Sequence, residues 1–200
     1  SMKRLLLPVL FSLALAGTAS AASYNIDARH TQVLFTYSHF GLSHQVGRLM
    51  EVSGTFDFDP AQPAKSSIDV QVPMSSLSTG IAKLDAHMKS PEMFDAEKFP
   101  TASFKSGKVT VIDKNQLSVA GDLTIHGVTR PVVFDVTINK AEIDPARKLG
   151  VAGFNASTTI KRSEFGVVFM LPKVPDEVKL SISMEAREPS KEVPEAKKPG

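Results

Sequence analysis

The sequence predicts an all-β protein, a closed antiparallel barrel of about eight strands with one short amphipathic helix and a lid loop. Most of the chain alternates between apolar and polar residues, which is the period of strands with one buried face. Only one segment has the period of a helix. Such strands pair as a sandwich or close as a barrel. The barrel is favoured because the strands are long and contain few prolines, which mark sheet edges.

Residues 1–21 are interpreted as a cloning residue followed by an export signal. Ser1, which precedes Met2, is expected to be the cloning residue. Lys3 and Arg4 then precede an apolar run, and small residues end the segment at Ala21. This is the pattern of a secretory signal peptide cleaved near Ala21, and the run is short for a membrane-spanning helix. An uncleaved N-terminal anchor is the alternative. We expect the barrel domain over 22–187.

Composition narrows the classes of function. Removing residues 1–21 takes away two basic and no acidic residues, so the formal net charge falls from +2 to zero. No basic excess is left to indicate nucleic-acid binding. The absence of cysteine excludes disulfides, a nucleophilic thiol and thiolate metal sites, so stability must come from a core. The segment 188–200, rich in Pro, Glu and Lys, is expected to be a disordered charged tail.

The strand pattern is clearest after a short strand expected over 23–27. In the segment 30–39 the apolar face is formed by Thr31, Val33, Phe35, Tyr37 and His39. A histidine that closes an apolar row is expected at the mouth of a lined cavity, or at an ordinary strand end that meets water. The glycines and serines of 41–47 indicate a loop.

Alternation continues along the rest of the chain. Further strands are expected over 49–59, 67–72, 101–106, 108–113, 117–126, 132–138, 150–160 and 178–187. Gly54 and Gly121 fall on inward positions, where a glycine bends a barrel wall or leaves free space inside.

One segment changes period. Ile81, Leu84 and Met88 have the spacing of an amphipathic helix, which ends at Ser90. The apolar residues Met93, Phe94 and Phe99 follow in a loop. We expect this loop to pack as a lid over an open end of the barrel.

No motif favours catalysis, so no catalytic residue, metal ligand or cofactor is predicted. The sequence has no nucleophile elbow, no Gly-rich phosphate loop and no His-x-x-x-His pair. His30, His39 and His44 could ligate a metal, but their spacing matches no common pattern. What remains is an apolar interior with a few polar groups near one end, which suits a long apolar molecule. A barrel packed solid with its own side chains is the alternative.

The chain resembles the YceI-like family, which comprises bacterial periplasmic proteins. The motifs that carry the resemblance occur in order through the whole domain. They are Tyr24-Asn25-Ile26-Asp27, His30-Thr31-x-Val33-x-Phe35-x-x-x-His39-x-Gly41-x-Ser43-x-x-x-Gly47, Met93-Phe94-Asp95, Phe99-Pro100-x-x-x-Phe104-x-Ser106, Gly121-x-Leu123-Thr124-Ile125-His126-Gly127-Val128-Thr129-Arg130-Pro131 and Ile160-x-Arg162-Ser163-x-Phe165-Gly166.

The resemblance implies a lipocalin-like eight-stranded barrel in the periplasm, sealed at one end, with a non-enzymatic role. It implies a bound polyisoprenoid, isoprenoid quinone or fatty amide. By motif position it carries over the pocket or mouth residues His30, Phe35, His39, Phe94, Phe104, Arg162, Ser163 and Phe165. Met93 departs from the aromatic residue that the family often has there, which alters the expected pocket width.

The leading hypothesis is therefore a carrier or store for a long-chain lipid. The expected tunnel is lined by Val33, Phe35, Tyr37, Val52, Phe56, Phe58, Phe134 and Phe154. His39 and Arg162 are expected to meet the polar head near the mouth. A metal-dependent enzyme that uses the three histidines, and a filled barrel that serves as an interaction scaffold, are the alternatives. Transient contact with a membrane and a homodimer through the mouth stay open.

Overall fold

The computed structural model describes residues 21–190. Apart from Ala21, the expected cloning residue and signal peptide lie outside the described residues. Apart from 188–190, so does the expected tail. In the described part no helix is long and apolar enough to cross a membrane.

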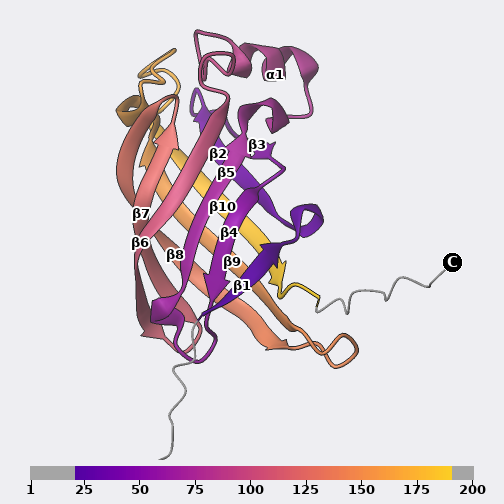
Figure 1. Ribbon diagram of the computed structural model, residues 1–200. Coiled ribbons are helices and arrows are strands. Elements are labelled where there is room, and N and C mark those ends of the chain that lie inside the picture. Colours follow the sequence, from indigo (N-terminus) through magenta and orange to yellow (C-terminus); the bar gives the residue numbers. More distant parts are fainter. Residues whose placement is uncertain (1–20, 191–200) are drawn as a thin grey trace, which may run out of the picture.

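A single antiparallel sheet of ten strand segments curls into a barrel (Figure 1). The segments are β1 (Ala22–Ile26), β2 (Gln32–His39), β3 (Ser43–Leu49), β4 (Ser53–Phe58), β5 (Ser67–Pro73), β6 (Thr101–Asp113), β7 (Gln116–Ile125), β8 (Val128–Ile143), β9 (Gly150–Lys161) and β10 (Glu177–Arg187). The short 3₁₀ helices are η1 (Ala28–His30), η2 (Pro63–Lys65), η3 (Met74–Ser76) and η4 (Arg162–Phe165).

The ten strand segments correspond to eight barrel strands, because two of the barrel strands are interrupted. β1 and β2 both pair with β10, while β4 pairs with β1 and β3 with β2. The barrel closes where Asn25 and Ile26 pair with Arg187 and Ala186. The predicted eight-stranded antiparallel barrel with one helix is confirmed.

The first interruption lies at Asp27. Its carboxylate accepts a hydrogen bond from the backbone N–H of Arg29 at 3.1 Å, which stabilises the turn of η1. The strand expected from His30 therefore begins two residues later, at Gln32.

The expected loop over 41–47 is wrong, because most of it is β3. Phe40 and Gly41 have φ angles of 53° and 73°, which allow a tight hairpin turn between β2 and β3. Gly47 fits in the strand because the ring of Phe35 covers it: a Cβ at this position would clash with Phe35 Cζ. The glycine that suggested a loop instead makes room for an inward aromatic ring.

Two other strand boundaries also differ from expectation. The strand expected from residue 49 begins at Ser53. The two strands expected on either side of Gly107 form one strand, β6, with a register shift between Ser106 and Lys108. Gly107 therefore marks a bulge within a strand rather than a turn.

The helix α1 (Ala82–Lys89) lies across the upper end of the barrel in Figure 1. Met88 is buried in the core, but Ile81 precedes the helix and is 58 % exposed, so its predicted place on the apolar face is wrong. Asp85 fixes the start of the helix by accepting hydrogen bonds from the backbone N–H and the hydroxyl of Thr79, both at 2.6 Å.

The lid loop is anchored to the end of α1. The backbone N–H of Phe94 donates to Met88 O at 3.0 Å, and that of Ala96 donates to Lys89 O at 2.9 Å. Phe99 packs edge-on against the ring of His126, with centroids 4.8 Å apart. The loop is therefore held both by α1 and by the turn after β7.

Candidate functional site

The barrel is not packed solid, because two adjoining chambers lie along its interior. The upper chamber, beneath α1, has a volume of about 350 Å³, and the lower one about 190 Å³. Leu49, Ala102, Ile125 and Leu180 line both, so the chambers meet at a ring of aliphatic side chains. Together they follow the length of the barrel, which suits an elongated apolar ligand.

The lower chamber is walled by inward-facing strand residues. At one side of it Phe56 and Phe58 stack on each other, and Phe154 packs edge-to-face against both, with centroids 5.1 Å apart for Phe58 and Phe154. Tyr24 packs on Phe58 from outside the chamber at 5.6 Å. This aromatic cluster closes the barrel end away from α1.

The upper chamber is roofed by segments outside the sheet. Leu84 and Met88 come from α1, and the lid loop adds Met93 and Phe94. The 166–174 loop adds Val167, Phe169, Met170 and Val174. The ring of Phe169 packs edge-on against His87 of α1, with centroids 5.1 Å apart. The roof is therefore made of three segments over the barrel end, with the lid loop and the 166–174 loop both in contact with α1.

Most of the predicted ligand-binding residues line these chambers, although their binding role stays a prediction. Those on the upper chamber are Phe35, Tyr37, His39, Met93, Phe94, Arg162 and Phe165. Those on the lower chamber are Val33, Val52, Phe56, Phe58, Phe104, Phe134 and Phe154.

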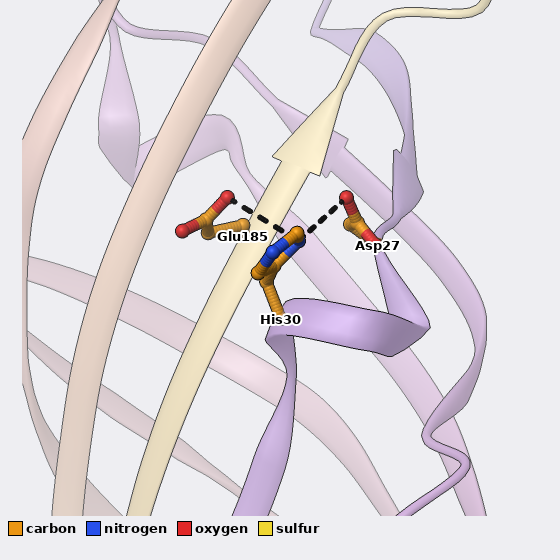
Figure 2. A group of neighbouring side chains, drawn as sticks. All are labelled: Asp27, His30 and Glu185. Atoms are coloured by element: carbon orange, nitrogen blue, oxygen red, sulfur yellow. Dashed lines mark hydrogen bonds and ion pairs between the residues drawn. The ribbon is translucent and has the colours of Figure 1, made fainter.

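Two predicted residues line neither chamber. Ser163 donates its backbone N–H and its hydroxyl to the carboxylate of Asp176, at 2.8 and 2.6 Å, which ties η4 to the start of β10. His30 lies on the outside of the barrel at the end of η1, between Asp27 and Glu185, as Figure 2 shows. Their placement at the pocket or mouth is corrected, because both side chains have protein partners elsewhere.

Arg162 lines the upper chamber, but one N–H group of each of its three nitrogens donates to the protein. Nε donates to Pro175 O at 3.1 Å, Nη1 to Val167 O at 3.0 Å and Nη2 to Val174 O at 2.7 Å. Burial lowers the pKa of the guanidinium, and the neighbouring carboxylate of Asp176 opposes that shift. The first role of Arg162 is therefore to hold the 166–174 loop over the chamber.

Tyr37 and His39 present polar atoms without such partners. Tyr37 stacks on Phe35 with centroids 6.4 Å apart, and within the described residues its hydroxyl makes no hydrogen bond. Burial raises the pKa of Tyr37, so the phenol stays protonated and can donate. His39 is exposed at the mouth and packs edge-on against Phe40 at 4.5 Å. The upper chamber therefore offers these polar groups to a ligand at its mouth end.

Sequence reasoning missed the 166–174 loop as a part of the cavity. A signal was present, because Val167-Val168-Phe169-Met170-Leu171 is a run of five apolar residues in a connection between strands. Val167 is buried and Val168 is 57 % exposed. An apolar run outside any strand could have identified a second covering segment besides the lid.

The structure does not bring the three candidate metal-binding histidines together. His44 lies beside His39 in the β2–β3 hairpin. His30 lies beyond the opposite end of β2, so the length of that strand, about 25 Å, separates it from His39. In the described part, one group of three potential metal-ligating residues has its ligand atoms within 4.8 Å of one another, and it consists of Asp27, His30 and Glu185.

This group already has a cationic partner. Arg187 Nη2 donates to Asp27 Oδ2 at 2.6 Å, and His30 Nδ1 lies 3.1 Å from the same oxygen. The backbone N–H of Asp27 also donates to Glu185 O at 2.8 Å. These hydrogen bonds and ion pairs therefore link the interrupted strand β1–β2 to β10.

Comparison with known proteins identifies the family. A family profile described as a YceI-like domain matches residues 24–186. The chain belongs to this family. Curated relatives include a UPF0312 protein of Pseudomonas savastanoi pv. phaseolicola, 40 % identical over 154 residues, which cover 76 % of this chain and 80 % of the relative. A UPF0312 protein of Vibrio cholerae is 39 % identical and covers 76 % of this chain and 81 % of its own length.

Solved structures share the YceI-like barrel. The Campylobacter jejuni YceI protein matches with a TM-score of 0.65 and 29 % identity, over 72 % of this chain and 84 % of that one. Burkholderia cenocepacia BcnA matches with a TM-score of 0.73 and 24 % identity, over 80 % and 99 %. A polyisoprenoid binding domain from Saccharophagus degradans matches with a TM-score of 0.61 and 13 % identity, over 85 % and 100 %. The last two likenesses concern the fold alone.

Proposed function

We propose that this YceI-like protein binds a long-chain amphiphilic lipid inside its barrel, most simply a polyisoprenoid or an isoprenoid quinone, and carries it without catalysis. The observation that supports the proposal is the pair of adjoining apolar chambers. A fatty amide would present the same kind of chain. The polyisoprenoid binding domain of Saccharophagus degradans is a precedent for such cargo in this fold.

The physical driving force is burial of the lipid chain. Burying a methylene group contributes roughly 0.8 kcal/mol, so one five-carbon isoprene unit contributes about 3–4 kcal/mol before ordering costs. The upper chamber of about 350 Å³ is within the range of small-molecule pockets, and the lower one extends it along the barrel axis. Several isoprene units would therefore bind tightly without any directed polar chemistry.

We further propose that the protein works in the periplasm after export by its N-terminal signal, and that it contacts a membrane transiently to load and release cargo. The apolar Phe40 and Val168, both partly exposed, belong to the turn and the loop at the upper chamber. The homodimer through the mouth stays a prediction. A histidine-based metalloenzyme is not favoured, because His30 lies a whole strand length away from His39 and His44.

The test is native mass spectrometry of the mature, untagged protein purified from its own periplasm, followed by solvent extraction. We expect a bound species of several hundred daltons that partitions into organic solvent. An apo mass, together with no uptake of added isoprenoid quinone or polyprenyl phosphate, would contradict the proposal. The scaffold hypothesis would then lead.

A further inference from the structure

The charges around the two chambers restrict the headgroup that a ligand can carry. In the described part, no Lys, Asp or Glu lines either chamber, and Arg162 is the one arginine that does. The lower chamber is lined mostly by aliphatic and phenylalanine side chains. Within the described residues, the lower chamber offers hydroxyl groups but no cationic side chain, so an anionic headgroup could find a cationic partner only in the upper chamber.

The single arginine is poorly placed to hold an anionic headgroup. Three of its five N–H groups, one on each nitrogen, donate to the backbone carbonyls of Pro175, Val167 and Val174 at 2.7–3.1 Å, which fixes the orientation of the guanidinium. The carboxylate of Asp176 stands close enough to offset part of its charge. Turning the guanidinium toward a phosphate would leave those carbonyls unpaired and release the 166–174 loop.

Burial of a phosphate in this chamber would therefore be unfavourable. An ionised group taken from water into apolar surroundings needs a charged or hydrogen-bonding partner to offset its lost hydration. His87 does not supply one freely, because its Nε2 lies 2.9 Å from the carboxylate of Glu92. Apart from the fixed guanidinium of Arg162, the groups left over in the upper chamber are the hydroxyl of Tyr37 and the ring of His39.

Tyr37 is well placed to bind an uncharged acceptor. Tyr37 and His39 project from the same face of β2, about 7 Å apart along the strand. The phenol has no hydrogen-bond partner within the described residues, and the chamber around it is apolar. A donor in such surroundings gains a full hydrogen bond from a carbonyl oxygen brought by the ligand.

We propose that the upper chamber selects lipids with an uncharged, carbonyl-bearing headgroup over lipid phosphates, and that the Tyr37 hydroxyl is the selecting donor. This inference rests on the proposed lipid-binding function. It assigns to Tyr37 a hydrogen bond that fixes the headgroup, while the apolar walls of both chambers hold the chain.

The test compares isoprenoids that differ in their headgroup. Menaquinone-4 and geranylgeranyl phosphate share one tail, with a quinone or a phosphate at its end, and squalene is an isoprenoid without a headgroup. Since the chain has no tryptophan, binding to the delipidated protein is followed by displacement of a fluorescent lipid. We expect wild-type protein to bind menaquinone-4 more tightly than geranylgeranyl phosphate.

Tyr37→Phe is the decisive variant, and Tyr24→Phe is its matched control. The chain has two tyrosines, and Tyr24 lines neither chamber. Loss of one hydrogen bond should weaken menaquinone-4 binding about three- to tenfold in Tyr37→Phe. Squalene binding by Tyr37→Phe, and quinone binding by Tyr24→Phe, should stay at the wild-type level.

Each of the other possible results would contradict one part of the proposal. Geranylgeranyl phosphate that binds wild-type protein as tightly as the quinone, or more so, would refute the selection against charge while leaving lipid binding intact. Unchanged quinone affinity in Tyr37→Phe would remove the role of Tyr37. If none of the three isoprenoids binds, the proposed function itself fails, and the inference fails with it.

Discussion

The two ends of the barrel are closed in different ways. At the lower end the rings of Phe56, Phe58 and Phe154 pack against one another, and all three belong to strands of the sheet. At the upper end α1, the lid loop and the 166–174 loop cover a larger chamber, and none of them is a strand. A strand-borne seal cannot open without breaking sheet hydrogen bonds, whereas a roof of loops can move while the sheet stays intact. The upper end is therefore the entrance in our scheme.

The largest expected effect is a difference in the free energy of unfolding between a variant of the lower aromatic cluster and a variant of the roof. Phe58 is 1 % exposed in the lower cluster, so Phe58→Ala should lower the free energy of unfolding by about 3–5 kcal/mol. Phe169→Ala in the roof should lower it by less than about 1 kcal/mol, because the ring lies over open cavity. Urea denaturation measures both. Equal losses would contradict the distinction between the two seals.

The next prediction concerns how the roof is held. Arg162→Lys keeps the charge but cannot reproduce three donations in different directions, so unfolding free energy should fall by about 1–3 kcal/mol. Hydrogen exchange should speed up in the 166–174 loop and not in β4. Arg130→Lys, which alters an exposed arginine, is the control. Uniformly faster exchange across the barrel would show that Arg162 supports the whole fold rather than the roof.

A third variant tests the fit between the sheet and the upper chamber. Gly47→Ala would place a methyl group against the ring of Phe35, which must shift into the chamber. We expect a loss of about 1–3 kcal/mol and weaker lipid binding. Gly153→Ala is the matched control, because nothing lies within 4 Å of the added Cβ. The idea fails if both variants bind lipid as the wild type does.

The smallest expected effect lies at the seam, where the interrupted strand β1–β2 meets β10. A hydrogen bond with His30, aided by the backbone N–H of Arg29 and the charge of Arg187, lowers the pKa of Asp27. A carboxylate with a lowered folded-state pKa stabilises the fold above its unfolded pKa of about 3.9, and this contribution is lost as the pH falls through the folded value.

Asp27→Asn should therefore melt below the wild type at neutral pH, with the difference shrinking in acid. Thermal melts from pH 7 down to about pH 3 measure this difference. A constant difference in melting temperature over that range would mean that ionisation of Asp27 is not what supports the seam. Asp57→Asn, on the exposed face of β4, is the control variant.

Much of the architecture was predictable because strands carry a period of two. The alternation in 30–39 placed Phe35 and Tyr37 on the inner face, and both line the upper chamber. The same parity placed Phe134 and Phe154 inside. Prediction from local alternation fails where a residue is explained by a contact with a distant part of the chain. Gly47 looks like a loop residue until Phe35 on the neighbouring strand is seen to cover it.

The sequence by itself determined most of the strands, their inward faces, the single helix and the apolar character of the interior, since each depends on the order of neighbouring residues. The tertiary structure decided what depends on partners far away in the chain. It joined β1 and β2 to β10, drew His30 to Asp27 on the outside, and directed Arg162 to the carbonyls of the 166–174 loop. Periodicity specifies which face of a strand a side chain lies on, but not which distant residue it contacts. In this protein those distant contacts make the loop-built roof of the upper end different from the aromatic seal of the lower end.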